Sequence, residues 1–270
     1  MRYKLTIGYD GTNYSGWQVQ KNAPSIQPLI QKALQTALRH PLDLTGSSRT
    51  DAGVHARGQT AHFDTDLSLN PDRLRLSLNA LLPPDVRIFA IDPVAIDFHA
   101  RYSALAKIYH YHLHKGPIAD PFTQLYRHQV YGPFDRERLE EGVRLFLGTH
   151  DFTSFANTKE KPEKDAVRTL YRLDIKEEKG GLRLEFEGDG FLYKMVRNIV
   201  GTLLDIAARK IEPDEIGKIF AARDRRRAGS TAPSKGLFLM EVVYESLRTM
   251  QNKSPPLAAP CRAAGGVEDK

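Results

Sequence analysis

The chain of 270 residues contains a single cysteine, Cys261. One cysteine excludes an intramolecular disulfide and a cysteine-based zinc site, and it favours a reducing compartment. No apolar run approaches the roughly 18 residues needed to cross a membrane. The N-terminus also lacks a basic segment followed by an apolar one, so we do not expect a secretory leader. We therefore expect a cytoplasmic protein rather than a secreted or membrane-spanning one.

Composition indicates a globular protein and leaves its function open. Hydrophobic residues make up 41% of the chain, which is enough for well-packed cores at this length. Lys and Arg number 39 against 33 Asp and Glu, so the formal net charge is +6. This excess of positive charge suits a nucleic-acid partner, although it is equally compatible with a basic protein of another kind.

Local patterns predict a mixture of strands and helices along most of the chain. In the first half they predict a strand over 2–9, a helix over 25–40 capped by Ser25, a helix from Asn70 to Pro83 and a strand over 86–91. In the second half they predict a strand over 106–114, a helix capped by Asp135, a hairpin of 167–176 and 182–188, helices over 191–209 and 213–222, and a strand over 237–244.

This mixture predicts an α+β fold with two subdomains. Residues 1–105 and 106–247 each offer two or more strands and two helices, and a cleft between the two subdomains is the expected site. Residues 248–270 carry prolines, alanines and glycines without periodicity. We expect this segment to be a disordered and dispensable tail.

A short polar loop, residues 47–57, places one carboxylate between two arginines. Asp51 follows Arg49 by two residues and precedes Arg57 by six. Nearby positive charge favours the ionised form of an aspartate, which acts as a nucleophile or base rather than an acid. A basic neighbourhood also points to a polyanionic substrate. The same residues suit a structural turn held by the two arginines, so the loop alone leaves both interpretations open.

The strand predicted over 106–114 separates aromatic side chains from histidines. Its period of two places Tyr109 on one face and His110, His112 and His114 on the other. Tyr109 is either a core residue or a ring against which an unstacked base packs. The histidines lack cysteine partners and the H-E-x-x-H spacing, so we expect a solvated or RNA-facing strand edge rather than a metal site.

Arg197 is an unusual residue in the helix predicted over 191–209. At about 100° per residue it falls on the apolar side of that helix, beside Tyr193 and Leu204. A buried guanidinium requires a carboxylate or phosphate partner, and a carboxylate from the other half of the chain would provide one. An arginine that extends to solvent is the alternative.

Two further basic clusters are compatible with phosphate contacts. One comprises Arg223, Arg225, Arg226 and Arg227, and the other comprises Lys159, Lys161 and Lys164. Charge runs of this kind are usually solvated, and their spacing encodes no readout of bases.

Five segments together resemble the bacterial tRNA pseudouridine synthase A family. They are 10–18, the octet Arg-Thr-Asp-Ala-Gly-Val-His-Ala at 49–56, 107–111, 191–201 and 232–239. The resemblance covers residues 3–244. It implies two similar halves, each an antiparallel sheet flanked by helices, around a central basic cleft. It also implies conversion of uridine to pseudouridine at positions 38, 39 and 40 in the anticodon stem-loop of tRNA, by a homodimer without cofactor or metal.

The resemblance implies a role for each candidate residue. Asp51 matches the nucleophilic aspartate, Tyr109 the tyrosine that packs on the target uracil, and Arg197 the residue that pairs with the catalytic carboxylate. Arg49 and Arg57 match positions near the flipped nucleotide. The residues leave open whether Asp51 attacks uracil C6, attacks ribose C1′ or acts as a base. A non-catalytic tRNA-binding or chaperone module, and a metal-dependent nuclease using the histidine strand, are the alternative functions.

Overall fold

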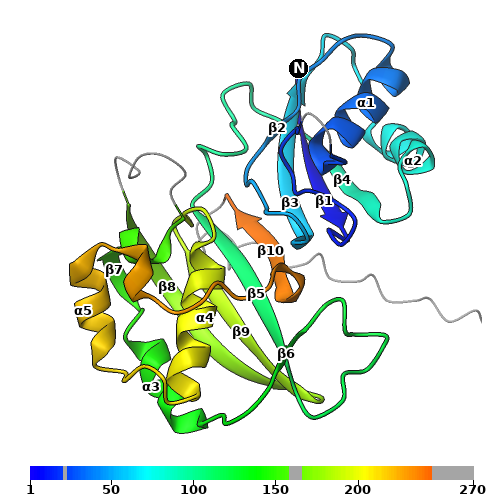
Figure 1. Cartoon of the computed structure of the whole chain (residues 1–270). Helices are drawn as coiled ribbons and strands as arrows, with labels where there is room; N and C mark the ends of the chain where they lie inside the picture. The colour runs from blue at the N-terminus through cyan, green and yellow to red at the C-terminus, as the bar shows by residue number, and fades with distance from the viewer. Residues whose placement is uncertain (21–22, 158–165, 245–270) are drawn as a thin grey trace, which may run out of the picture.

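A computed structural model describes residues 1–20, 23–157 and 166–244 (Figure 1). Its centre is a ten-stranded, mostly antiparallel sheet in the order β4-β1-β3-β10-β5-β9-β8-β7, with β2 beside β3 and β6 beside β5. The first half of the chain supplies β1 (Arg2–Tyr9), β2 (Thr45–Gly46), β3 (His55–Asp64) and β4 (Val86–Val94). The second half supplies β5 (Ala106–Lys115), β6 (His128–Val130), β7 (Gly148–Asp151), β8 (Val167–Glu178), β9 (Gly181–Gly188) and β10 (Leu237–Val243).

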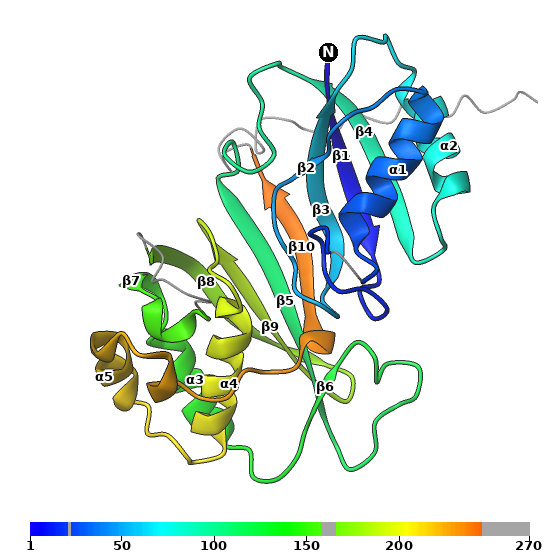
Figure 2. The same ribbon diagram turned by 45° about the horizontal axis from the view of Figure 1, so that its top comes forward.

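Two groups of helices flank the sheet, which confirms the predicted α+β class. The first group is α1 (Ile26–Leu38) and α2 (Pro71–Leu81), and the second is α3 (Arg136–Arg144), α4 (Met195–Ala207) and α5 (Glu215–Ala222). Each group covers the strands of its own half, and the two groups stand apart along the sheet (Figures 1 and 2). Within the described ranges, no helix combines the length and apolarity needed to cross a membrane.

Strand β10 joins the strands of the two halves in the middle of the sheet. Leu239 lies opposite Tyr109 in the antiparallel pair with β5 and opposite Ala56 in the parallel pair with β3. The sheet is therefore continuous from β4 to β7. No break in it marks the boundary between 1–105 and 106–247, and that division remains a prediction. The expected tail, 248–270, lies outside the described residues.

Several helix boundaries follow from the capping residues that the sequence indicated. The side chains of Asn70 and Asp135 accept hydrogen bonds from the backbone N–H groups three residues on, at 3.0 and 3.2 Å. Ser25 occupies the N-cap position of α1, but its hydroxyl donates to the carbonyl of Ala23 instead of capping the helix. Helix α4 begins at Met195 rather than at 191, because Lys194 adopts a left-handed conformation with φ of 60°.

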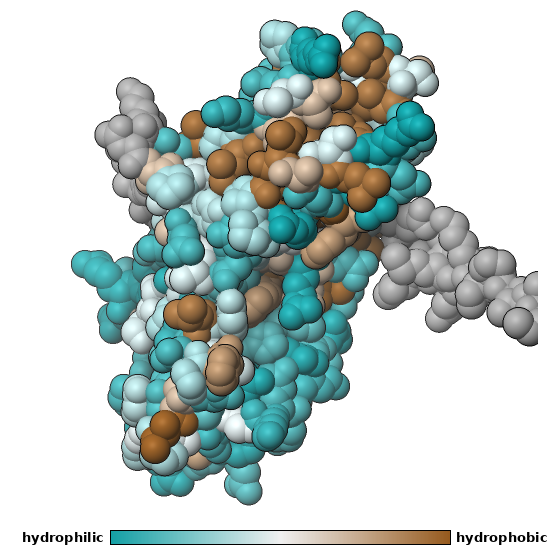
Figure 3. Space-filling model, turned by 90° about the vertical axis from the view of Figure 1, so that its right-hand side faces the viewer, coloured by the Kyte–Doolittle hydropathy of each residue, from teal (hydrophilic) through white to brown (hydrophobic). Residues whose placement is uncertain are grey.

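Other expectations were wrong or incomplete. The leucines of the helix predicted from Asn70 to Pro83 are not all buried, since Leu81 is 50% exposed. Apolar side chains gather on the surface of the first half (Figure 3). Strand β3 was not predicted, because most of its residues are buried on both faces and no alternation marks it. The short strands β2, β6 and β7 were missed as well.

The histidines of β5 lie in the interior of the sheet, so the expectation of a strand edge was wrong. Strand β5 is paired on one side with β10 and on the other with β9. His112 Nδ1 lies 2.9 Å from a carboxylate oxygen of Glu178, and His110 Nε2 lies 3.8 Å from one of Glu185. Burial lowers the pKa of His110 to about 4. No group of three metal-binding side chains occurs among the described residues.

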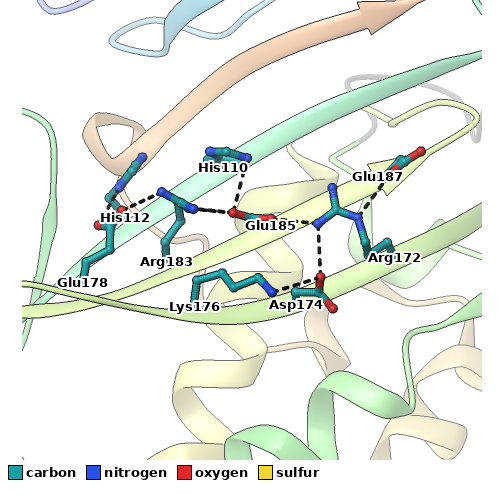
Figure 4. Close-up of polar contacts among 9 residues, drawn as sticks. All are labelled: His110, His112, Arg172, Asp174, Lys176, Glu178, Arg183, Glu185 and Glu187. Carbon is teal, nitrogen blue, oxygen red and sulfur yellow. Dashed lines mark hydrogen bonds and ion pairs between the residues drawn. The ribbon is translucent and has the colours of Figure 1, made fainter. Parts of the chain in front are cut away.

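These histidines belong to a charged network on the sheet face opposite the helices, which we call the open-face network (Figure 4). Arg172 contacts three carboxylates, those of Asp174, Glu185 and Glu187, at 2.7 to 3.1 Å. Arg183 contacts Glu185 and, at 2.8 Å, Glu178. The network therefore pairs each of its two arginines with more than one carboxylate across β8 and β9.

Candidate active site

Asp51 lies in the loop between β2 and β3, and backbone contacts hold this loop against the segment that follows β1. The N–H of Trp17 donates to the carbonyl of Thr50 at 3.1 Å. The N–H of Gly53 donates to the carbonyl of Tyr14, also at 3.1 Å. These two bonds lie on either side of Asp51. The carboxylate is thus presented by a fixed stretch of backbone rather than by a free loop.

Glycine at position 16 allows this close approach. Gly16 has φ of +96°, which L side chains rarely adopt, and a Cβ there would lie 2.4 Å from the carbonyl oxygen of Thr50. The hydroxyls of Tyr9 and Thr50 share a hydrogen bond of 2.8 Å beneath the loop. The segment 10–18 therefore supports the position of Asp51, although it supplies no reacting group itself.

Arg197 forms an ion pair with Asp51 across the two halves of the chain. Its Nη1 donates to Asp51 Oδ2 at 2.8 Å, and the two side chains are only 14% and 13% exposed. Its Nε donates to the carbonyl of Ala232 at 2.8 Å, which fixes the guanidinium. Helix α4 reaches this position because Gly201 packs against the backbone of Ser230, where any Cβ would collide. The carboxylate partner expected for Arg197 is therefore present.

Asp51 keeps one carboxylate oxygen unpaired. Its Oδ2 is bound by Arg197, while Oδ1 has no hydrogen-bond partner among the described residues. An aspartate held by one oxygen and open at the other is oriented for contact with a ligand.

Tyr109 contributes a buried ring to the same site. It lies on β5, is 7% exposed, and packs edge-to-face against Phe191 with ring centroids 5.1 Å apart. Burial raises the pKa of Tyr109 to about 12, and the charge of Asp51 adds to this effect. The phenol therefore stays neutral at physiological pH. Tyr109 is at once a core residue and part of the wall of the site.

A cleft of about 1060 Å³ brings these residues together. The first half contributes Trp17 and residues 47–52 to its lining, and the second half contributes Tyr109 and residues 191–197. Its charged lining residues are Asp51 and five cations, namely Arg49, Arg101, Lys107, Lys194 and Arg197. A cleft with one carboxylate among five cations suits a polyanionic ligand.

The two arginines that flank Asp51 in sequence separate in space. Arg49 is exposed and lines the cleft. Arg57 is exposed on β3 and does not belong to the cleft lining, because the chain leaves the loop at His55 and continues as a strand. The structure thus brings Asp51, Tyr109, Arg197 and Arg49 together and leaves Arg57 outside. A role for Arg57 in RNA binding remains a prediction.

The arginine cluster at 223–227 forms hydrogen bonds and ion pairs within the protein. Arg225 donates to the carbonyl of Gly229 at 2.8 Å and to the side chains of Asn198 and Thr231 at 2.9 and 3.0 Å. Arg223 pairs with Asp151 and Arg226 with Asp224. Arg225 is thus committed to internal hydrogen bonds, whereas Arg223 and Arg226 are 69% and 90% exposed and remain accessible to phosphate. The lysines of the other cluster, Lys159, Lys161 and Lys164, lie outside the described residues.

Several residues that line the cleft were not among the candidates predicted from the sequence. Trp17, Phe191 and Lys194 are among them. Trp17 lies in the segment 10–18, and the other two lie in 191–201, so the only signal was their place in segments that resemble a known family. The loop residues His99, Arg101 and Tyr102 were missed entirely.

Comparison with known proteins identifies relatives over most of the chain. The family model described as tRNA pseudouridine synthase matches residues 6–103 and 143–245. The tRNA pseudouridine synthase A 1 of Protochlamydia amoebophila is 58% identical over 247 residues, which cover 90% of this chain and 96% of that protein. The tRNA pseudouridine synthase A of Bacillus licheniformis is 44% identical over 248 residues, which cover 91% of this chain and 100% of that protein.

One solved structure with partial similarity comes from a different complex. A chain from a crystal structure of a Cbf5-Nop10-Gar1 complex gives a TM-score of 0.32 at 11% sequence identity, over 74% of this chain and 54% of that one. A similarity this low supports no conclusion about the site.

Proposed function

This chain belongs to the tRNA pseudouridine synthase family, and we propose that it converts uridine to pseudouridine at positions 38, 39 and 40 in the anticodon stem-loop of tRNA. Membership in the family makes it an isomerase that acts on tRNA uridine, and favours this activity over a non-catalytic tRNA-binding module or a nuclease. The choice of positions rests on the five sequence segments named above. The observation that carries the proposed mechanism is the Asp51–Arg197 ion pair inside a cationic cleft.

The reaction exchanges one glycosidic bond for another. The bond from uracil N1 to ribose C1′ breaks, the base rotates, a bond from C5 to C1′ forms, and C5 loses its proton while N1 gains one. The substrate undergoes no net oxidation or reduction, so the reaction needs no external oxidant or reductant. We propose that Asp51 is the nucleophile or base in these steps, because its Oδ1 is open to a ligand. Attack at C6, attack at C1′ and action as a base each agree with this geometry.

Arg197 orients the carboxylate in this proposal. One of its nitrogens holds Asp51 Oδ2 while another is held by the carbonyl of Ala232, so the carboxylate cannot rotate freely. Fixing the reacting group in this way lowers the entropic part of the barrier. The ion pair also joins α4 to the loop after β2, so the site is complete only when both halves are docked.

Tyr109 packs against the extruded uracil in this proposal. A base inside a helical stem must leave its stack before it can react, which costs roughly a few kcal/mol. Contact with an aromatic ring offsets part of that cost. The high pKa of Tyr109 supports a neutral phenol, which does not repel the anionic RNA.

We further propose that the enzyme acts as a cytoplasmic homodimer and needs neither cofactor nor metal. The support is the family resemblance, together with a reaction that transfers no electrons. Light scattering of the purified protein will measure its mass in solution. Pseudouridine mapping on tRNA from cells with and without the gene will identify the modified positions.

The decisive experiment uses tRNA labelled with tritium at uracil C5. The wild-type protein should release the label, and Asp51→Asn should reduce the rate of release by about 10⁴-fold, since the carboxylate takes part in every step. Binding of tRNA should persist in this variant. Asp43→Asn is the matched control, because Asp43 is an exposed carboxylate outside the cleft lining. Release by Asp51→Asn at the wild-type rate would contradict the proposed role.

A further inference from the structure

A tight loop between β4 and β5 borders the cleft at some distance in sequence from the residues discussed so far. The N–H of His99 donates to the hydroxyl of Ser103 at 2.9 Å, and the N–H of Ser103 donates to the carbonyl of His99 at 2.9 Å. The ring nitrogen Nδ1 of His99 accepts from the N–H groups of Arg101 and Tyr102 at 3.1 and 3.2 Å. Four hydrogen bonds thus fix the conformation of residues 99–103.

This fixed loop presents an exposed aromatic ring. Tyr102 is 77% exposed and lines the cleft, and its hydroxyl has no hydrogen-bond partner among the described residues. The His99 ring lies 4.3 Å from the Tyr102 ring, and the Arg101 guanidinium lies 5.8 Å from its centroid. The Tyr102 ring contributes little to the core, yet the hydrogen bonds of the loop fix the backbone that presents it before a ligand binds. An exposed ring on a rigid loop beside a basic cleft is suited to stacking with a base.

Lys107 adds to the lining of the same cleft a cation without an ion-pair partner in the described part of the chain. It lies two residues before Tyr109 on the same face of β5, and it lines the cleft. Within the described residues no carboxylate lies within ion-pair distance of its ammonium group. Burial and the nearby charges of Arg101 and Arg168 lower its pKa to about 8, while Asp189 opposes this shift. Lys107 is therefore a partly buried cation that has no ion-pair partner among the described residues and can accept an anionic ligand group.

We propose that Tyr102, Arg101 and Lys107 form a second nucleotide-binding site, which receives the nucleotide adjacent to the target uridine. The base of that nucleotide stacks on Tyr102, and the phosphate that joins it to the target contacts Lys107 and Arg101. This inference rests on the proposed function, because the target uridine is taken to lie against Tyr109. Lys107 and Tyr109 are two positions apart on the strand, or about 7 Å, a distance that one extended nucleotide spans.

The proposed site accounts for tolerance toward neighbouring bases. Stacking on an aromatic ring discriminates weakly, because every base offers a flat face. A phosphate contact is likewise independent of sequence. An enzyme that acts on three successive positions meets a different neighbour at each one, and a site of this chemistry accepts all of them.

Fluorescence of 2-aminopurine tests the stacking contact. Two anticodon stem-loop RNAs would carry the probe on the 5′ or the 3′ side of the target uridine. Wild-type protein should change the fluorescence of one of them, because the probe leaves the helical stack and moves onto Tyr102. Tyr102→Phe should preserve this change, and Tyr102→Ala should abolish it and raise KM about tenfold with little effect on kcat.

Tyr131→Ala is the matched control, because Tyr131 is 75% exposed and lies outside the cleft lining. A melting temperature near that of the wild type will show that each variant is folded. Wild-type KM and fluorescence in folded Tyr102→Ala would overturn the inference, as would equal losses in Tyr131→Ala. If the wild type releases no tritium at all, the proposed function fails, and that outcome is distinct because it precedes any comparison of variants.

Salt dependence tests the phosphate contact. Affinity falls as salt rises, and the magnitude of the slope of log affinity against log salt should decrease by about one in Lys107→Met. In Lys107→Arg the slope should return toward the wild-type value. Lys218→Met is the control, since Lys218 is exposed on α5 and outside the cleft lining. An unchanged slope in Lys107→Met, or an equal fall in Lys218→Met, would refute the contact.

Discussion

The two faces of the sheet at β5 differ in whether their positively charged side chains form ion pairs. On the open face, Arg172 of β8 and Arg183 of β9 each contact at least two carboxylates. In the cleft, Arg49, Arg101 and Lys107 have no ion pair within the described residues. The two sets lie on opposite sides of one sheet. The two sets therefore differ in whether carboxylates of the protein pair with the cations.

Cations that pair with carboxylates stabilise the fold. Cations without such partners repel one another, and they are available to bind an anionic ligand. The open-face network is complete without substrate, and the cleft is not. Unpaired charge in a site lowers stability, and the binding of a polyanion recovers the loss. The comparison predicts that variants on the open face change stability, while variants in the cleft change activity or tRNA affinity.

The largest expected effect in this comparison comes from Arg197→Met. Arg197 is paired like an open-face arginine but lies in the cleft, so its loss should lower kcat for tritium release by about 10²- to 10³-fold. Arg197→Lys should recover part of the rate. Arg183→Met is the matched control, and calorimetry should show that it lowers the melting temperature while kcat stays near that of the wild type. If both variants reduced kcat equally, the distinction between the two faces would fail.

The second prediction concerns Glu185→Gln in the open-face network. This carboxylate is buried and receives both Arg172 and Arg183, so neutralising it should reduce the free energy of unfolding by about 2 kcal/mol. Urea denaturation will measure the change, and kcat should stay unchanged. Glu177→Gln is the control, because Glu177 is 74% exposed and should contribute under about 1 kcal/mol. A larger loss for Glu177→Gln than for Glu185→Gln would contradict this account.

The smallest effect separates Arg49 from Arg57. Both are exposed arginines close to Asp51 in sequence, yet only Arg49 lines the cleft. Arg49→Ala should weaken tRNA binding several-fold and reduce the salt slope by about one, because one phosphate contact is lost. Arg57→Ala should have a smaller effect on both the tRNA affinity and the salt slope. Equal effects would mean that the RNA extends past the cleft and over β3.

Features set by local chemistry were predictable from the sequence. Asn70 and Asp135 cap helices because their side chains bond backbone N–H groups only three residues away. Arg197 was a candidate because a cation on an apolar helix face needs a partner unless it extends to solvent, and the family resemblance pointed to the catalytic carboxylate, Asp51, with which it pairs. The capping interactions lie within one helical turn of the capping residue. The Arg197 ion pair follows from the free-energy cost of burying an unpaired charge.

Features set by long-range pairing were not predictable. Strand β3 shows no alternation, since both of its faces are covered, and β10 lies between β3 and β5 although it follows them by more than a hundred residues. Arg57 seemed close to Asp51 because of its place in the sequence, whereas the intervening strand residues carry it away. The loop at 99–103 has no periodicity, so only its hydrogen bonds reveal it.

The central position of β10 has a consequence for how the protein is made. The ribosome completes residues 237–243 only after every other strand of the sheet has emerged. Until then β3 and β5 lack the strand that lies between them, and nothing in the sheet fixes the distance from the Asp51 loop to Tyr109. A nascent chain therefore carries both halves of the site without their alignment. The two halves of the site are aligned only after this last strand has been made and has inserted between β3 and β5.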